Sequence, residues 1–573
     1  MIGRLSLVSF AVFALGCSSD PTGGPPPPPP PPPPASLSCS AVAPVQLAVG
    51  QHQVIDAAQT SGCVRVPAAG AAGAEYIVDI ASTASTRSTA GVAGSYYIRT
   101  ANPSATAAPQ ITASAAPSLR PQSHPLSAQG QFDLMLREKE RALAADPRYR
   151  VAIPGAPARA AAGVPNVGDQ QTFKVCDNLQ CTAFVDVPAT ARFVGTHAAI
   201  FMDNSVPQND TLLEVDYADL GRTFDTYHYP IDVTAFGNES DRDNNQRVIV
   251  LLTDAVNALT PDCTNGRVLG YFFGGDLLAG FPNSNNGEIF YAFVPSPATT
   301  QCPNAVTRSI AVDNIKPTLI HEFQHMISYN QHALLRGGPS EETWLNEALS
   351  HFAEELGGRL IPITECPHFS SCRSQYVSGD IFNSYDYLTD TESHFLIYPT
   401  SSTGTLEERG ASWYFLRWVL DQFATDTILG TDLTQKLVRT AATGVANITT
   451  ATGGDFSTMV PEWLLAAYLD DLPGFTPLSD RIKFKSWGLR GIWTNPVNQD
   501  PPLRGGFHGF PLKPDVTSGI YTHAGTLRGG SGRHLRLSQP ANGAAIDVQF
   551  VKTSAGEALD PALVARIGIA RIQ

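Results

Sequence analysis

The chain has 573 residues, of which 43% are hydrophobic, and this is enough apolar sequence to build several ordinary cores. Its formal net charge is −14 at pH 7, and no run of basic residues is visible. This balance argues against nucleic acid as a partner and against electrostatic binding to anionic lipid.

The first residues have the composition of an export signal. Residues 1–16 contain one arginine and an apolar stretch that is too short to span a membrane, and small residues then precede Cys17. The run Ala-Leu-Gly-Cys that ends at Cys17 resembles a lipoprotein processing site. We therefore expect Cys17 to carry a lipid, which would be the only contact with a membrane, and simple secretion is the alternative.

A proline-rich spacer and a region of short strands follow. Residues 17–35 include an unbroken proline run at 25–34, which is typical of a stiff, extended spacer. Residues 36–101 contain strand-like runs at 62–66 and 75–80, separated by glycine, serine and alanine turns. This pattern predicts a small β-domain.

The next segment, residues 102–164, is rich in alanine, proline and serine and contains one predicted helix, at residues 132–145. Such a composition does not predict a domain with a core of its own. We expect the segment to be a linker or part of a pro-region that is removed on maturation.

An acidic turn precedes the predicted strand at residues 247–252. Asp241, Asp243 and Asn245 place oxygen side chains at alternate positions, as the first half of a calcium loop does. The glycine and the final glutamate of a standard calcium loop are missing. A looser Ca²⁺ site and an ordinary turn stabilised by aspartate and asparagine side chains are the two interpretations.

The strongest motif is His-Glu-Phe-Gln-His at residues 321–325, within the region 165–510. Apolar residues at helical spacing around it predict a helix, in which residues four apart project from one face. His321 and His325 would then hold one zinc ion, and Glu322 would take a proton from metal-bound water. The alternative is an ordinary amphipathic helix with two exposed histidines.

Catalytic zinc keeps three protein ligands and leaves the fourth position open for water. The histidine that some zinc enzymes carry six residues after the second ligand is absent, since Gln331 stands there. A second predicted helix follows about twenty residues further on. The carboxylates in and next to it are Glu341, Glu342, Glu347 and Glu354.

The motif helix and the run Asn-Glu-Ala-Leu-Ser at residues 346–350 resemble the metallopeptidases whose third zinc ligand is a glutamate, of which thermolysin is a familiar member. Residues 318–356 and 236–245 are most similar to the hyicolysin-type family of secreted bacterial neutral proteases. The resemblance covers about residues 211–423 and is most specific around the two helices.

This resemblance implies that His321, His325 and Glu347 bind zinc and that Glu322 is the general base. Where the thermolysin pattern has an aspartate four residues after the ligand glutamate, this chain has His351. Glu354 lies one turn further on and would orient a zinc-bound histidine instead.

A donor for the developing oxyanion is harder to place. The candidates that follow the zinc helices are Tyr385, Tyr387, His394 and Tyr414. Tyr414 is our candidate, although its apolar helical surroundings are also typical of a packed core tyrosine.

The strand predicted at residues 287–294 precedes the zinc helix. In proteases of this kind such a strand often borders the cleft and pairs with an extended substrate. An interior strand without substrate contact is an equally weighted interpretation.

The last segment, residues 511–573, alternates strand-like runs at 534–537 and 545–551 with glycine-rich turns, which predicts a C-terminal β-rich domain. Eight cysteines follow Cys17, and this even number indicates disulfides and an oxidising compartment. Proximity in the sequence suggests the pairs Cys39 with Cys63, Cys176 with Cys181, Cys263 with Cys302, and Cys366 with Cys372.

The sequence thus predicts an α+β fold, in which a two-helix zinc metallopeptidase domain, made of a mixed sheet and a helical half, is flanked by small β-rich domains. The predicted function is an exported, zinc-dependent endopeptidase that acts on polypeptides as a monomer. The alternative is a cell-surface binding or adhesion protein whose zinc site is inert or structural. The intact Glu322 favours the enzyme, because a structural site does not need a base.

Overall fold

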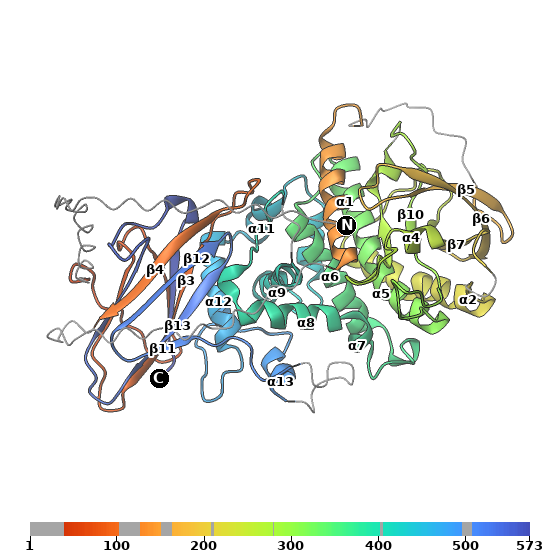
Figure 1. The fold of residues 1–573 in the computed structure, drawn as a ribbon. Helices are drawn as coiled ribbons and strands as arrows, with labels where there is room; N and C mark the ends of the chain where they lie inside the picture. Colours follow the sequence, from red (N-terminus) through yellow and green to blue (C-terminus); the bar gives the residue numbers. More distant parts are fainter. Residues whose placement is uncertain are drawn as a thin grey trace, which may run out of the picture.

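The computed structural model describes residues 39–101, 127–149, 163–207, 211–278, 280–401, 405–495 and 507–573. In these residues the chain has an α+β fold, with a β-sandwich at one end and a sheet and helices at the other (Figure 1). The predicted signal at 1–16, the lipidated Cys17 and the spacer at 17–35 lie outside these ranges. No helix within the ranges is long and apolar enough to cross a membrane.

One mixed sheet of six strands supports the motif helix. Its central strands are parallel and buried, and β8, in the middle, is apolar along its whole length, as strands covered on both faces are. The strands, in spatial order, are β5 (Gln170–Cys176), β6 (Phe184–Val194), β7 (Ala198–Asp203), β8 (Val248–Leu252), β10 (Ile289–Ala292) and β9 (Gly270–Phe272).

β10 covers the middle half of the strand predicted at residues 287–294. It pairs with β8 on one side and with β9 on the other, so it is an interior strand. This was the second of the two interpretations, and the edge strand next to the motif helix is β9 instead.

The predicted zinc helices are α5 (Arg308–Tyr329) and α6 (Thr343–Leu360), which pack against each other. The other α-helices are α1 (Ala128–Ala145), α2 (Glu214–Thr223), α3 (Tyr229–Ala235), α4 (Asp254–Ala258), α7 (Cys372–Tyr376), α8 (Ser378–Thr389), α9 (Leu406–Phe423), α10 (Thr431–Val438), α11 (Gly444–Thr452), α12 (Phe456–Leu469) and α13 (Leu489–Thr494). Short 3₁₀ or π turns are η1 (Phe224–His228), η2 (Gly274–Leu277), η3 (Asn330–Leu334), η4 (Ile363–Glu365), η5 (Thr391–Ser393), η6 (Asp480–Ile482) and η9 (Pro561–Leu563).

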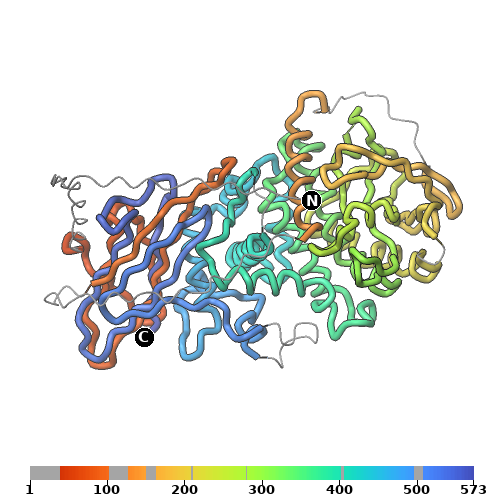
Figure 2. Tube along the Cα trace, viewed as in Figure 1, coloured from red at the N-terminus to blue at the C-terminus, as the bar shows by residue number. Residues whose placement is uncertain are grey.

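The β-sandwich contains strands from both ends of the described chain. One sheet has the order β1 (His52–Asp56), β15 (Arg566–Arg571), β3 (Ala74–Ala81), β13 (Gly532–Gln539) and β11 (Asp515–Thr517). The other has the order β12 (Tyr521–Arg528), β4 (Ala93–Ala101), β14 (Ile546–Val551) and β2 (Cys63–Val66). Figure 2 shows the red and blue segments interleaved.

The two β-rich domains expected at residues 36–101 and 511–573 therefore form one sandwich. β3 lies between β13 and β15, and β4 lies between β12 and β14, so the early strands pair with late ones. Each segment alone would leave long strand edges unpaired, which is the physical reason that they fold together.

The sandwich is joined to the helical half through α12. This helix packs on β3 and β15, and the Leu464 side chain approaches Gly532 so closely that a side chain there would collide with it. The ring of His534 on β13 bonds to the Leu464 carbonyl oxygen at 2.9 Å. This contact fixes the sandwich on the helices.

The described cysteines form four disulfides, and the pairs are the ones that proximity in the sequence suggested. They are Cys39 with Cys63, Cys176 with Cys181, Cys263 with Cys302, and Cys366 with Cys372. Each bridge closes a local loop, at separations from 5 to 39 residues.

Candidate active site

Three donor atoms converge where α5 meets α6. The Nε2 atoms of His321 and His325 are 3.1 Å apart, and the Glu347 carboxylate oxygens lie 3.6 Å and 3.5 Å from them. Ligands at about 2.1 Å from a tetrahedral zinc ion are roughly 3.4 Å apart, so the donor set fits this metal. The predicted ligands are thus brought together.

Hydrogen bonds orient both imidazoles. Glu354 lies 2.5 Å from His321 Nδ1, in the position expected from the sequence. Asn346 Oδ1 lies 3.0 Å from His325 Nδ1, and the Ser350 hydroxyl lies at the same distance. Because the outer nitrogen of each ring is engaged, the inner nitrogen keeps a lone pair that faces the other donors.

Arg409 reaches the third donor from the first turn of α9. Its Nη2 donates to Glu347 Oε2 at 2.7 Å. Burial raises the pKa of the Glu347 carboxyl, but Arg409 and the two imidazoles outweigh burial and hold this pKa well below its usual range. Glu347 therefore stays anionic, as a metal ligand must.

Arg409 was not predicted from the sequence, because it is 62 residues from Glu347 and belongs to no short motif. A capping box does mark the start of its helix. Thr405 caps the N-terminus of α9, and Glu408 bonds back to the Thr405 amide.

Glu322 lies beside the donor atoms and is buried. Its Oε2 accepts a hydrogen bond from the Phe272 amide of β9 at 3.0 Å, and among the described residues its Oε1 has no hydrogen-bond partner. Burial, together with the charge of Asp133, raises the pKa of this carboxyl above its usual value. A carboxylate with a raised pKa and one free oxygen is suited to accept a proton.

The ring of His351 lies next to that of His321, with 4.9 Å between the ring centroids, and other side chains engage its nitrogens. The Arg409 Nε–H donates to His351 Nε2 at 3.0 Å, and Asp380 lies 2.8 Å from His351 Nδ1. Both ring nitrogens are therefore engaged with other side chains. His351 thus helps to position Arg409, and its Nδ1 also lies 3.2 Å from the Glu354 carboxylate that engages His321.

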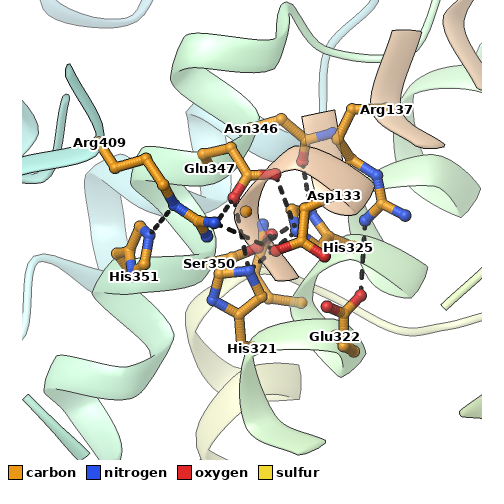
Figure 3. Close-up of polar contacts among 12 residues, drawn as sticks. Asp133, Arg137, His321, Glu322, His325, Asn346, Glu347, Ser350, His351 and Arg409 are labelled. Atoms are coloured by element: carbon orange, nitrogen blue, oxygen red, sulfur yellow. Dashed lines mark hydrogen bonds and ion pairs between the residues drawn. The ribbon is translucent and has the colours of Figure 1, made fainter. Parts of the chain in front are cut away.

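An acidic residue of α1 enters the same site. Asp133 accepts a hydrogen bond from Arg409 Nη1 at 3.1 Å, and its carboxylate, a His321 nitrogen and a Glu347 oxygen all lie within 4.8 Å of one another. Figure 3 shows Asp133 and Arg137 pointing into the site from α1. The predicted helix at 132–145 is thus present within α1, but it is packed into the site rather than exposed as a linker helix would be.

A cavity of about 830 Å³ opens beside the donors. It is lined in part by His321, Glu322, His351, Glu354 and Tyr376. The side chains that would bind and process a substrate therefore face a space large enough for several amino-acid residues.

Tyr414 is not placed to donate to an oxyanion. Its ring stacks on Phe484 at 4.5 Å and also contacts Trp463 and Trp493 in the core. Tyr414 lies five positions after Arg409, and this spacing turns the two side chains to different faces of α9. Core packing therefore determines the position of this tyrosine, and Tyr414 is not among the residues that line the cavity.

The predicted calcium ligands lie in one loop, but they do not all point to one centre. Oxygens of Asp241, Asp243 and the buried Glu288 lie within 4.8 Å of one another. Asn245 instead donates to Asp243 at 2.9 Å and closes a local turn. Glu288, which directly precedes β10, is the third carboxylate of this group in place of the amide of Asn245. The sequence of the loop could not predict this, because it does not show that β10 lies next to the loop.

Two buried imidazoles and a buried carboxylate, with a second carboxylate beside a cavity, form the kind of metal centre that hydrolases use. No protein-family model matches the chain. Over 140 residues the chain is 31% identical to the neutral metalloprotease ShpI of Staphylococcus hyicus. The aligned part is 24% of this chain and 30% of ShpI, so the chain spans less than a third of the length of this curated relative.

Proposed function

We propose that the chain is an exported zinc endopeptidase of the glutamate-ligand type, similar to the hyicolysin family, that hydrolyses peptide bonds in polypeptides. The convergence of His321, His325 and Glu347 next to Glu322 is the observation that carries this proposal. The partial similarity to a neutral metalloprotease supports the same class.

Each residue has a physical role in this proposal. Zinc, when bound, would acidify a water molecule and polarise the scissile carbonyl group. Glu322 would accept the water proton at Oε1 and pass it to the departing amine, while the Phe272 amide keeps its other oxygen in place. Glu354 and Asn346 hold the imidazoles in the ligating tautomer.

The oxyanion donor must face the cavity. His351, Tyr376 and Arg409 are lining residues that carry N–H or O–H groups. We assign the role to Arg409 rather than to Tyr414, because a donor acts only where the charge develops. The ring nitrogens of His351 are engaged with Arg409 and Asp380, and the Tyr376 hydroxyl lies 2.9 Å from His228.

The location and a second metal also belong to the proposal. Four disulfides agree with an oxidising compartment, which supports export. Lipid attachment at Cys17 is proposed from the sequence alone. We place the calcium site at Asp241, Asp243 and Glu288. Calcium there would offset the mutual repulsion of the three carboxylates.

An adhesion protein with an inert metal site is the less favoured alternative. It does not explain why Glu322 Oε1 is buried next to the donor atoms and has no hydrogen-bond partner among the described residues. A carboxylate in this state destabilises the fold, and a catalytic role accounts for its presence.

Metal removal tests the function. Casein hydrolysis is measured with the full chain before and after limited proteolysis, in the presence of a chelator, and after zinc is restored. We expect chelation to abolish hydrolysis and zinc to restore it. Hydrolysis that survives chelation, or a zinc-loaded, proteolytically processed protein that cleaves nothing, would rule out the proposed activity.

A further inference from the structure

We propose that α1 is an inhibitory segment, in which Asp133 fills the open coordination position of the metal while neighbouring side chains cover the substrate-binding edge of β9. This inference rests on the proposed function, because it concerns the regulation of the same site. Three sets of contacts support it.

The first set concerns the metal. His321, His325 and Glu347 supply three donors, and a catalytic site needs a fourth position for water. Asp133 is 2% exposed, and its carboxylate, a His321 nitrogen and a Glu347 oxygen lie within 4.8 Å of one another. Gln129, one turn earlier on α1, donates to Asp133 Oδ1 at 2.6 Å and fixes its direction. A carboxylate held there takes the place that water must occupy.

The second set concerns the edge of the sheet. An edge strand offers backbone groups to which an extended peptide can add as a further strand. β9 is such an edge, and side chains of α1 already bind its backbone. Gln129 donates to the Gly270 carbonyl oxygen at 2.8 Å, and Arg137 donates to the Phe272 carbonyl oxygen at 2.8 Å.

The same pattern continues beyond both ends of β9. Gln129 Oε1 accepts from the Leu269 amide at 2.6 Å, and Glu140 accepts from the Gly274 amide at 2.6 Å. The side chains of α1 thus occupy outward-facing backbone donors and acceptors at Gly270, Phe272 and Gly274. An extended substrate would need these groups.

The third set concerns the base. The Arg137 guanidinium lies 3.6 Å from Glu322 Oε2, and both side chains are 1% exposed. This cation stands between α1 and the general base, where a substrate would approach. One helix therefore contacts the metal ligands, the substrate edge and the base at once, as an inhibitor of this site would.

The cobalt-substituted full chain tests the metal contact. Cobalt(II) reports its coordination in the visible spectrum, and acetohydroxamate is a small ligand for an open position. We expect acetohydroxamate to leave the wild-type spectrum unchanged and to change the spectrum of Asp133→Asn. The matched control is Asp146→Asn, an acid at the end of α1 whose side chain pairs with the exposed Arg148, and it should behave as wild type.

Two further measurements accompany the spectra. Zinc should leave Asp133→Asn roughly tenfold faster than it leaves the wild type, because one ligand is lost. Gln129→Ala removes the contact with the β9 edge and the hydrogen bond to Asp133 together, so it should increase casein hydrolysis and let acetohydroxamate change the cobalt spectrum. Asp133→Ser is the second variant if Asp133→Asn does not fold, as judged by circular dichroism.

The outcomes separate this inference from the proposed function. If acetohydroxamate changes the wild-type and Asp133→Asn spectra alike, α1 does not close the site and the inference is wrong. If only the variant responds but no form of the protein cleaves casein, the closed coordination stands and the peptidase proposal fails. A chain that binds neither cobalt nor zinc overturns both.

Discussion

A single amide fixes the orientation of one metal ligand. Asn346 Oδ1 accepts from His325 Nδ1, which leaves the other ring nitrogen free to bind metal. We expect Asn346→Ala to lower zinc affinity by roughly tenfold to a hundredfold, measured by competition with a chromophoric chelator. Asn204→Ala, in an exposed turn after β7, is the control and should bind zinc as wild type. Equal affinities in both variants would show that Asn346 does not orient the ring.

Short motifs allowed most of this site to be predicted. His321, Glu322 and His325 lie within about one turn of α5. Glu347 and Glu354 share a face of α6. The convergence of these residues follows from helical geometry and from the contact between the two helices. Arg409 and Asp133 could not be found in this way, because they come from distant segments and meet the site only after folding.

A buried acid in the sandwich predicts a pH effect on stability. Burial raises the pKa of Asp79 well above its usual value, although the Gly568 amide acts in the opposite direction. The pKa of Asp79 in the folded protein thus exceeds the value of about 3.9 in the unfolded chain. The contribution of Asp79 to the free energy of unfolding is therefore fully present below pH 4, and it is lost as pH rises through the folded pKa.

We therefore expect Asp79→Asn, which stays neutral, to raise the free energy of unfolding at pH 8 by about 1 kcal/mol or more relative to wild type. The difference should shrink toward pH 4. Thermal unfolding at both pH values measures it, with the exposed Glu557→Gln as a control that should show no such trend. If the wild type is as stable as Asp79→Asn at pH 8, the buried charge of Asp79 does not lower the free energy of unfolding.

At the level of elements, the start of α9 determines where Arg409 lies. Thr405→Ala removes the N-cap hydrogen bond to the Glu408 amide and should lower the free energy of unfolding by about 1 kcal/mol. Chemical denaturation measures this loss. The exposed Thr450→Ala in α11 should cost less, and an equal loss in both variants would mean that the cap has no special role.

The positions of individual strands were predicted better than the pairing between strands. The strand-like runs at 62–66, 75–80 and 545–551 coincide with β2, β3 and β14. Periodicity identifies such runs because it is a local property of the chain. The pairing of β3 with β13 joins residues more than 450 positions apart, and local sequence contains no signal for it.

At the scale of the whole molecule, the sandwich requires both ends of the described chain. A chain that lacks residues 1–101 loses β3 and β4, whose side chains at Ile77, Val78 and Ile98 are buried. The apolar faces and edges of their partner strands would be exposed. We expect this variant to aggregate or to lose cooperative unfolding. A soluble, cooperative truncated chain would show that the late strands form a domain alone.

The central claim is that three ligands hold a metal beside Glu322, which acts as the base. Zinc content and casein hydrolysis of Glu322→Gln, measured together on chains activated by limited proteolysis, test it most directly. We predict one zinc ion per chain, as in the wild type, and a loss of hydrolysis of at least roughly a hundredfold. A Glu322→Gln protein that binds zinc and hydrolyses casein at the wild-type rate would contradict the account.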